Sequence, residues 1–198
     1  MSGLKSTNIA ATTAAVANRF VTTANMSLTP YTIANASPVW AGGCNVTITH
    51  TTVAGADTLG TITIVGTDLH GNAVSEVITP LAGTVATGTK VFRTVTSATS
   101  IGWVAVSTAD TIVIGCAAGS IAAIGGGVLA SVNVNNVVAT AFTVSDAAGT
   151  IATIGASAAI GNYVYGVPWS GYLKVATTST NDVTLIHSPG VPSVYAMA

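Results

Sequence analysis

The feature that most constrains this chain is a series of strand-length runs in which Ile or Val alternates with Thr. Residues 46–50 and 61–65 show it most clearly, because apolar side chains fall at every second position and threonines lie between them. A period of two residues is that of a strand with one face buried and one face solvated. Turn residues separate similar runs at 74–78, 90–95, 103–106 and 111–114. The pattern predicts an all-β fold.

Residue usage agrees with this prediction. Strong helix formers such as Glu, Lys, Gln and Leu are scarce, whereas β-branched Val, Ile and Thr are abundant and suit a pleated surface. The 21 glycines and six prolines are spread along the chain, where they punctuate the runs as turns.

Short motifs recur in the second half of the chain in the same order as in the first. The matched pairs are Thr67–Gly71 with Ser145–Gly149, Gly102–Val106 with Gly171–Val175, Asp110–Ile114 with Asp182–Ile186, and Gly42-Gly43 with Gly126-Gly127. In the first pair, Asp bonds back to the turn backbone and Gly accepts a positive φ. The order of the matches predicts two tandem small antiparallel β-sandwich domains, at 39–118 and 119–198, joined near 117–119.

Residues 1–38 differ from the rest, since they are polar and weakly patterned and Pro30 and Pro38 interrupt regular structure. We expect an extended N-terminal arm, with a short helix near 8–21. Its larger apolar side chains are spaced as anchors for a neighbouring subunit; they are Phe20, Val21, Met26, Leu28, Tyr31 and Ile33. The alternative is that the arm packs back on its own first domain.

Charge is unusually scarce. Five Lys and Arg with six Asp and Glu make up 6% of the chain, against about 25% in an average soluble protein. A net charge of −1 supplies no basic field, so nucleic acid is not an expected partner. A surface with so little repulsion suits a protein packed against copies of itself, although a threonine-coated secreted domain has the same composition.

One uncharged stretch, Ile112–Ala130, is long enough for a membrane span. Five glycines interrupt it and no Lys or Arg flanks it. We therefore expect a buried strand, a Gly/Ala-rich linker and the next strand, and no membrane partner. The first 24 residues have no continuous apolar segment, so no signal peptide is expected either.

The chain offers little material for catalysis, a cofactor or a metal site, so we expect no enzyme. The three histidines, His50, His70 and His187, are isolated in the sequence, and the six acidic residues are scattered. The Asp68–Asn72 segment has too few oxygen ligands for calcium, so we expect it to form an Asx turn. Cys44 and Cys116 are expected to be buried free thiols, with a single bridge as the alternative. The aromatic residues are expected in the core and at interfaces, with a sugar-stacking platform as the alternative; they are Trp40, Trp103, Trp169, Tyr163, Tyr165 and Tyr172.

Residues 60–79, GTITIVGTDLHGNAVSEVIT, followed by residues 89–96, TKVFRTVT, resemble virion proteins of tailed bacteriophages. The succession of a Thr/Ile strand, a T-D-x-x-G-N turn and two further strands is similar to β-sandwich capsid decoration (cement) proteins. The resemblance covers about 60 residues of the first domain. It implies a structural role on the capsid surface after assembly in the host cytoplasm, contacts with the major capsid protein, and a homo-oligomer, with a trimer favoured.

Two functional hypotheses follow. The first is a decoration or cement protein that acts through protein–protein contacts. The second is a receptor- or carbohydrate-binding module, such as a head-fibre or tail-associated adhesion domain, which should present exposed aromatic and polar side chains at one loop edge.

Overall fold

The computed structural model describes residues 3–10, 13–52, 58–104, 110–177 and 181–189. The described residues form thirteen strands in three antiparallel sheets and contain no helix, which confirms the predicted all-β class. The chain divides into two compact units. The first unit comprises Ala15–Val39 and Gly43–Ala118, and the second comprises Met1–Ala14, Trp40–Gly42 and Gly119–Ala198.

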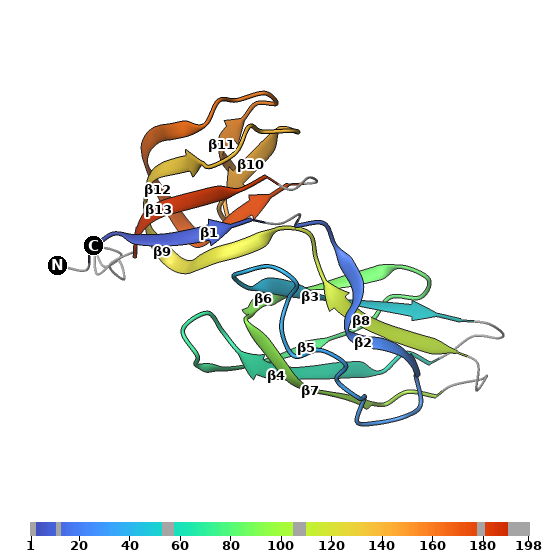
Figure 1. The fold of residues 1–198 in the computed structure, drawn as a ribbon. Helices are drawn as coiled ribbons and strands as arrows, with labels where there is room; N and C mark the ends of the chain where they lie inside the picture. Colours follow the sequence, from blue (N-terminus) through green and yellow to red (C-terminus); the bar gives the residue numbers. More distant parts are fainter. Residues whose placement is uncertain (1–2, 11–12, 53–57, 105–109, 178–180, 190–198) are drawn as a thin grey trace. The chain divides into compact units, whose positions relative to one another are not determined.

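The first unit contains two sheets, of four and three strands (Figure 1). The strand orders are β2-β8-β3-β6 and β5-β4-β7. The strands are β2 (Val16–Asn25), β3 (Cys44–Thr51), β4 (Thr61–Thr67), β5 (Ala73–Ile78), β6 (Val85–Phe92), β7 (Thr94–Ile101) and β8 (Thr111–Cys116).

Side chains on alternate positions of these strands form the core of the first unit. Ile48 of β3, Ile62 and Ile64 of β4, and Ile112 and Ile114 of β8 are fully buried. Thr61 and Thr63, which alternate with the buried Ile62 and Ile64 in β4, are only partly covered. The Ile/Thr alternation in the sequence is therefore the alternation between core and surface.

The second unit has a single six-stranded sheet with the order β1-β13-β9-β12-β10-β11. Its core contains Ile9, Leu129, Phe142, Trp169 and Leu185, among other residues. The strands are β1 (Lys5–Ile9), β9 (Ser120–Val134), β10 (Phe142–Ser145), β11 (Thr150–Ile154), β12 (Gly161–Ala176) and β13 (Val183–Pro189).

The two units share one strand order. If β6 and β7 are joined end to end, the first unit runs β2-β8-β3-(β6,β7)-β4-β5, and the second runs β1-β13-β9-β12-β10-β11. A single residue, Arg93, separates β6 from β7, and its N–H donates to Thr67 O (2.7 Å) where the chain changes sheet. In the second unit the 16-residue β12 pairs with β9 on both sides of an irregularity between Val164 and Val167. The expected single strand at 90–95 is therefore two strands that meet at a corner.

The N-terminal segment differs from the expected arm and helix. Residues 8–21 are not helical where the structure describes them; β1 pairs with β13 and β2 pairs with β8, so both add to sheets of their own chain (Figure 1). The physical reason is that β8 and β13 would otherwise expose unpaired backbone N–H and C=O groups along a sheet edge. The segment belongs partly to each unit, which neither the arm nor its alternative anticipated.

The expected Gly/Ala-rich linker is also wrong. Residues 120–127 form the first half of β9 and pair with residues 169–175 of β12, so only Ala117–Gly119 separate β8 from β9. Small side chains do not prevent a strand when another strand satisfies the backbone on its edge. The expected run at 103–106 is described only to Val104, which forms an isolated bridge with Thr58; residues 105 and 106 lie outside the described residues.

Candidate interaction surfaces

A segment without regular secondary structure, residues 26–36, lies between the two sheets of the first unit and contacts both; we call it the seam segment. Towards β7, the Tyr31 N–H donates to Ala98 O (2.9 Å) and the Val95 N–H donates to Ala36 O (2.7 Å). Towards β2, the Ala34 N–H donates to Phe20 O (2.7 Å). These bonds let the seam segment bridge two sheet edges that are not hydrogen-bonded to each other.

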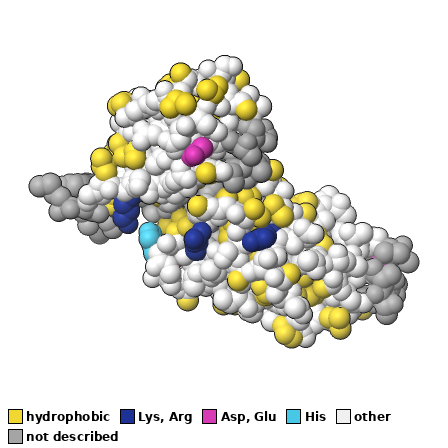
Figure 2. All heavy atoms as spheres, in the orientation of Figure 1, with side chains coloured by type: hydrophobic (Ala, Val, Ile, Leu, Met, Phe, Trp, Pro, Cys, Tyr) yellow, Lys and Arg dark blue, Asp and Glu magenta, His cyan; other side chains and the backbone are white. Residues whose placement is uncertain are grey.

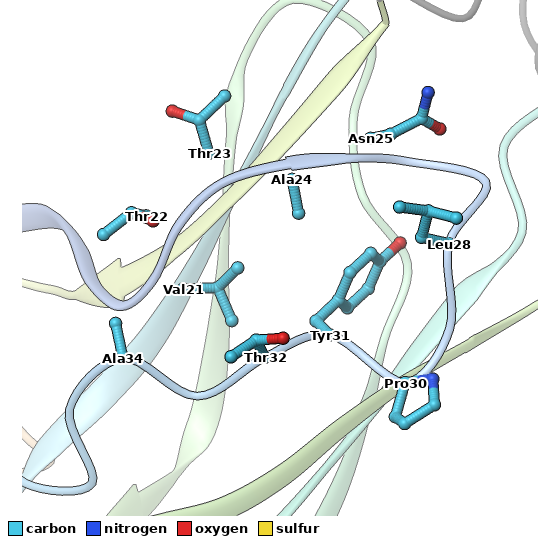
Figure 3. A pocket seen from close by; sticks show the side chains of 10 residues that line it. All are labelled: Val21, Thr22, Thr23, Ala24, Asn25, Leu28, Pro30, Tyr31, Thr32 and Ala34. Atoms are coloured by element: carbon cyan, nitrogen blue, oxygen red, sulfur yellow. The ribbon is translucent and has the colours of Figure 1, made fainter.

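A hollow of about 320 Å³ lies where the seam segment parts from β2 (Figure 3). Its walls carry no charged side chain and are formed by Val21, Thr22, Thr23, Ala24, Asn25, Leu28, Pro30, Tyr31, Thr32 and Ala34. The Tyr31 hydroxyl donates to Met26 O (2.8 Å), and burial raises the pKa of this phenol against a smaller opposing effect of Ser100. Without a group that titrates near neutrality, the hollow suits a neutral occupant and not acid–base chemistry.

The six side chains predicted to anchor a neighbouring subunit do not act alike. Phe20, Val21, Met26 and Tyr31 are buried within the first unit, so they hold their own chain together. Leu28 is 64% exposed beside the hollow, and Ile33 is half-buried. Leu28 is therefore the one large anchor among the six that remains available to a partner.

A second hollow, of about 560 Å³, lies between the edge strands β5 and β6. Glu76 lines it and joins the strands, because its carboxylate accepts the Thr89 N–H (2.6 Å) and the Lys90 N–H (3.2 Å). Val77, Leu81 and Val85 also line it and are each more than half exposed. The sequence analysis missed this surface, although Val77 lies out of phase with Val74 and Ile78 on the same strand and so faces away from them.

Exposed aliphatic side chains recur on both units. Besides the residues already named, the described examples include Leu4, Val39, Ile101, Val104, Val137, Ile160 and Val164. Charged groups are sparse between them, and Figure 2 shows one face on which uncharged side chains and backbone cover most of the area. Such a surface presents apolar contacts with little electrostatic repulsion against other proteins.

Residues with potential for chemistry are dispersed. No group of three or more His, Cys, Asp or Glu side chains that could hold a metal occurs among the described residues. Asp68 forms the expected Asx turn, accepting the N–H groups of His70 (2.8 Å) and Asn72 (2.9 Å). His50 and His187 are buried, and each lies edge-on to a tryptophan, Trp103 and Trp169 respectively.

The two cysteines are buried free thiols on the neighbouring strands β3 and β8. Val46 lies directly opposite Cys116, so Cys44 is diagonal to it. A hydrogen bond with the Cys116 thiol, together with burial, raises the pKa of Cys44 and keeps this thiol protonated.

No protein-family model, curated protein or solved structure matches this chain. The described ranges hold no helix that could cross a lipid bilayer. Residues 112–130, which are long enough for a span, instead contribute to β8 and β9.

Proposed function

We propose that this chain is a non-enzymatic structural protein of a tailed-bacteriophage virion, which decorates or cements the capsid through protein–protein contacts. The observation that carries the proposal is the surface: eleven charged residues in 198, with large aliphatic side chains exposed on both units. Apolar surface of this kind is stabilised when it is buried against another protein. The resemblance of residues 60–79 and 89–96 to capsid decoration proteins supplies the class of assembly.

The partners in this proposal are copies of the same chain, with a trimer favoured, and the major capsid protein. The finer fold assignment belongs to the same proposal: two tandem β-sandwich domains derived from one ancestral domain. The shared strand order supports it, as does the placement of the Asp68 and Asp146 turns on the equivalent hairpins β4–β5 and β10–β11.

The carbohydrate- or receptor-binding alternative has weaker support. A sugar-stacking site needs exposed aromatic faces. Trp40 and Trp169 are each only 4% exposed, and Trp103 is half-buried with its Nε1–H donating to Thr61 O (3.3 Å). For these three tryptophans, burial agrees with the expectation of a role in the interior of the units.

Quantitative mass spectrometry of purified virions tests the proposal. We expect the protein in a fixed copy number relative to the major capsid protein. Its absence from purified particles would overturn the proposed role.

A binding assay locates the contact surface. Recombinant protein is incubated with capsids that lack it, and the variant Leu81→Glu is compared with Thr150→Glu, which adds the same charge at an exposed polar position of β11. We expect Leu81→Glu to reduce binding at least tenfold and Thr150→Glu to leave it unchanged. Equal binding by both variants would exclude the β5–β6 hollow from the contact.

A further inference from the structure

The N-terminal strand β1 occupies an edge that the rest of the second unit cannot cover by itself. It pairs antiparallel with β13, from Lys5 opposite His187 to Ile9 opposite Val183. In the first unit the equivalent edge strand, β2, is the strand that precedes β3 in the sequence. In the second unit β9 begins at Ser120, four positions after the end of β8, so the chain has no room there for a corresponding strand. The position is filled from the far end of the sequence.

The contacts that hold β1 against β13 are made by residues 5–9 themselves and are mostly polar. Asn8 Nδ2 donates to Asp182 Oδ1 (2.7 Å) and Thr184 Oγ1 (3.1 Å), and Thr7 Oγ1 lies 3.4 Å from His187 Nε2. Only Ile9 of the strand has a fully buried side chain. Residues 5–9 of any copy would make the same contacts, so transfer between copies loses no interaction at this edge.

The chain is held firmly just after β1. The Gly119 N–H donates to Thr13 O (2.7 Å), and the Thr177 N–H donates to Thr13 Oγ1 (2.8 Å), all within the second unit. Three residues with small side chains, 10–12, separate Ile9 from Thr13. A short connection between an anchored residue and an edge strand is the arrangement in which strand exchange between protomers is easily reached.

We propose that β1 is exchanged between copies, so that the β13 edge of each second unit binds residues 5–9 of a second copy of this chain. The exchange deepens the proposed structural role, since it explains how copies with few charges are joined in register by main-chain hydrogen bonds. It also retains part of the expected assembly arm, now confined to β1, whereas β2 is fixed by the burial of Phe20 and Val21.

Disulfide trapping across chains tests the exchange directly. Ser6 and Ile186 lie opposite each other on the partly exposed face of the β1–β13 pair, where paired Cβ atoms are close enough for a disulfide. Full-length Ser6→Cys and Ile186→Cys proteins with different tags are refolded together and mildly oxidised. Each protein carries only one of the two introduced cysteines. A disulfide that joins the two differently tagged proteins can therefore form only across chains. The native Cys44 and Cys116 are buried, which limits competing reactions.

On the exchange hypothesis, up to about half of an equimolar mixture migrates as a disulfide-linked dimer on a non-reducing gel, because random pairing of copies also places like variants together. The double variant Ser6→Cys/Ile186→Cys forms covalent multimers of the 19.4 kDa chain. The control mixture of Ser6→Cys with Thr150→Cys, on the opposite edge strand β11, should give no such dimer. A double variant that closes only within a monomer, or no disulfide at all, would overturn the proposal. Failure of the exchange hypothesis would not count against the proposed virion role. Mass spectrometry of purified virions tests that role separately, because it asks only whether the protein is present in particles.

Discussion

Asp68 and Asp146 occupy the same place in the strand order of the two units, each at the turn of a hairpin that ends in an edge strand. Their environments differ. Asp68 is half-buried and bonds only within its turn, whereas Asp146 is 6% exposed and its Oδ2 also accepts the Ser170 N–H of β12 (3.0 Å). The second carboxylate thus joins its hairpin to the neighbouring strand.

This difference predicts unequal costs of removing the two carboxylates. Asp146→Ala leaves the N–H groups of Ala148, Gly149 and Ser170 without their acceptor, and we expect a loss of about 1–3 kcal/mol in the free energy of unfolding. Asp68→Ala should cost less, because water reaches the freed N–H groups. Urea unfolding of both variants checks the order, and equal losses would contradict it.

The Asp146 carboxylate should also make the free energy of unfolding depend on pH in the acid range. Burial alone would raise the pKa of Asp146, but the N–H bonds from Ser170, Ala148 and Gly149 outweigh it and lower the pKa below the ordinary value of 3.8. The resulting stabilisation is present above the unfolded-state pKa and is lost as pH falls through the folded-state pKa. The difference in the free energy of unfolding between pH 6 and pH 3 should therefore be smaller in Asp146→Asn than in the wild type. An unchanged difference would show that Asp146 contributes no pH-dependent stability.

Glu76 and Gly88 are predicted to be energetically coupled. A Cβ on Gly88 would lie 2.9 Å from both Glu76 Cδ and Ile78 Cδ1 and would meet the carboxylate that joins β5 to β6. We expect Gly88→Ala to cost about 1–3 kcal/mol and to cost less in a Glu76→Ala background, where that carboxylate is absent. A double-mutant cycle from urea unfolding measures the coupling. Additive effects would show that Gly88 is not required by the Glu76 contact.

His187 predicts a second pH dependence, near neutrality. Burial lowers its pKa below 6.5, a backbone bond involving Ser188 opposes this, and the charge of Lys5 lowers the pKa further. Because a depressed histidine pKa means that the unfolded chain binds the proton first, stability is full above pH 6.5 and falls as pH drops towards the folded-state pKa. The urea midpoint should decline from pH 7.5 to 5.5 in the wild type, but less in His187→Gln. An equal decline in His187→Gln and in the wild type would contradict this prediction.

The cysteines should be unreactive in the native protein. Both thiols are fully buried, and the hydrogen bond with Cys116 and burial raise the pKa of Cys44, which disfavours the reactive thiolate. A thiol reagent should modify neither residue in buffer and both in guanidinium chloride without reductant. Finding no reactive thiol in the unfolded chain would instead reveal a disulfide.

Much of the sheet structure could be predicted from local patterns. The alternation at 46–50, 61–65 and 111–114 placed strands that the structure contains, because side chains on a pleated strand must sort between core and solvent whatever partner the strand has. The recurring Asp turns likewise indicated two hairpins, since Asp satisfies its own turn through local bonds.

The candidate interaction surfaces could not be predicted from local sequence patterns in the same way. Of the six anchors expected in the N-terminal segment, four are buried in the first unit, and the β5–β6 hollow was not foreseen. Leu28 and Tyr31 have similar surroundings in sequence, yet Leu28 is exposed and Tyr31 is buried because its N–H and hydroxyl both find acceptors, in Ala98 and Met26. Exposure of an individual apolar side chain depends on neighbours distant in the chain.

By itself, the sequence determined the all-β class, the scarcity of charge and the positions of the strongly alternating strands, because these follow from residue type and local geometry. Only the tertiary structure decided that β1 pairs with β13 and β2 with β8, and that residues 120–127 are a strand. Those segments have weak patterns of their own. They become strands because the edges beside them carry backbone groups that must be hydrogen-bonded, and that requirement is visible only once the sheets exist.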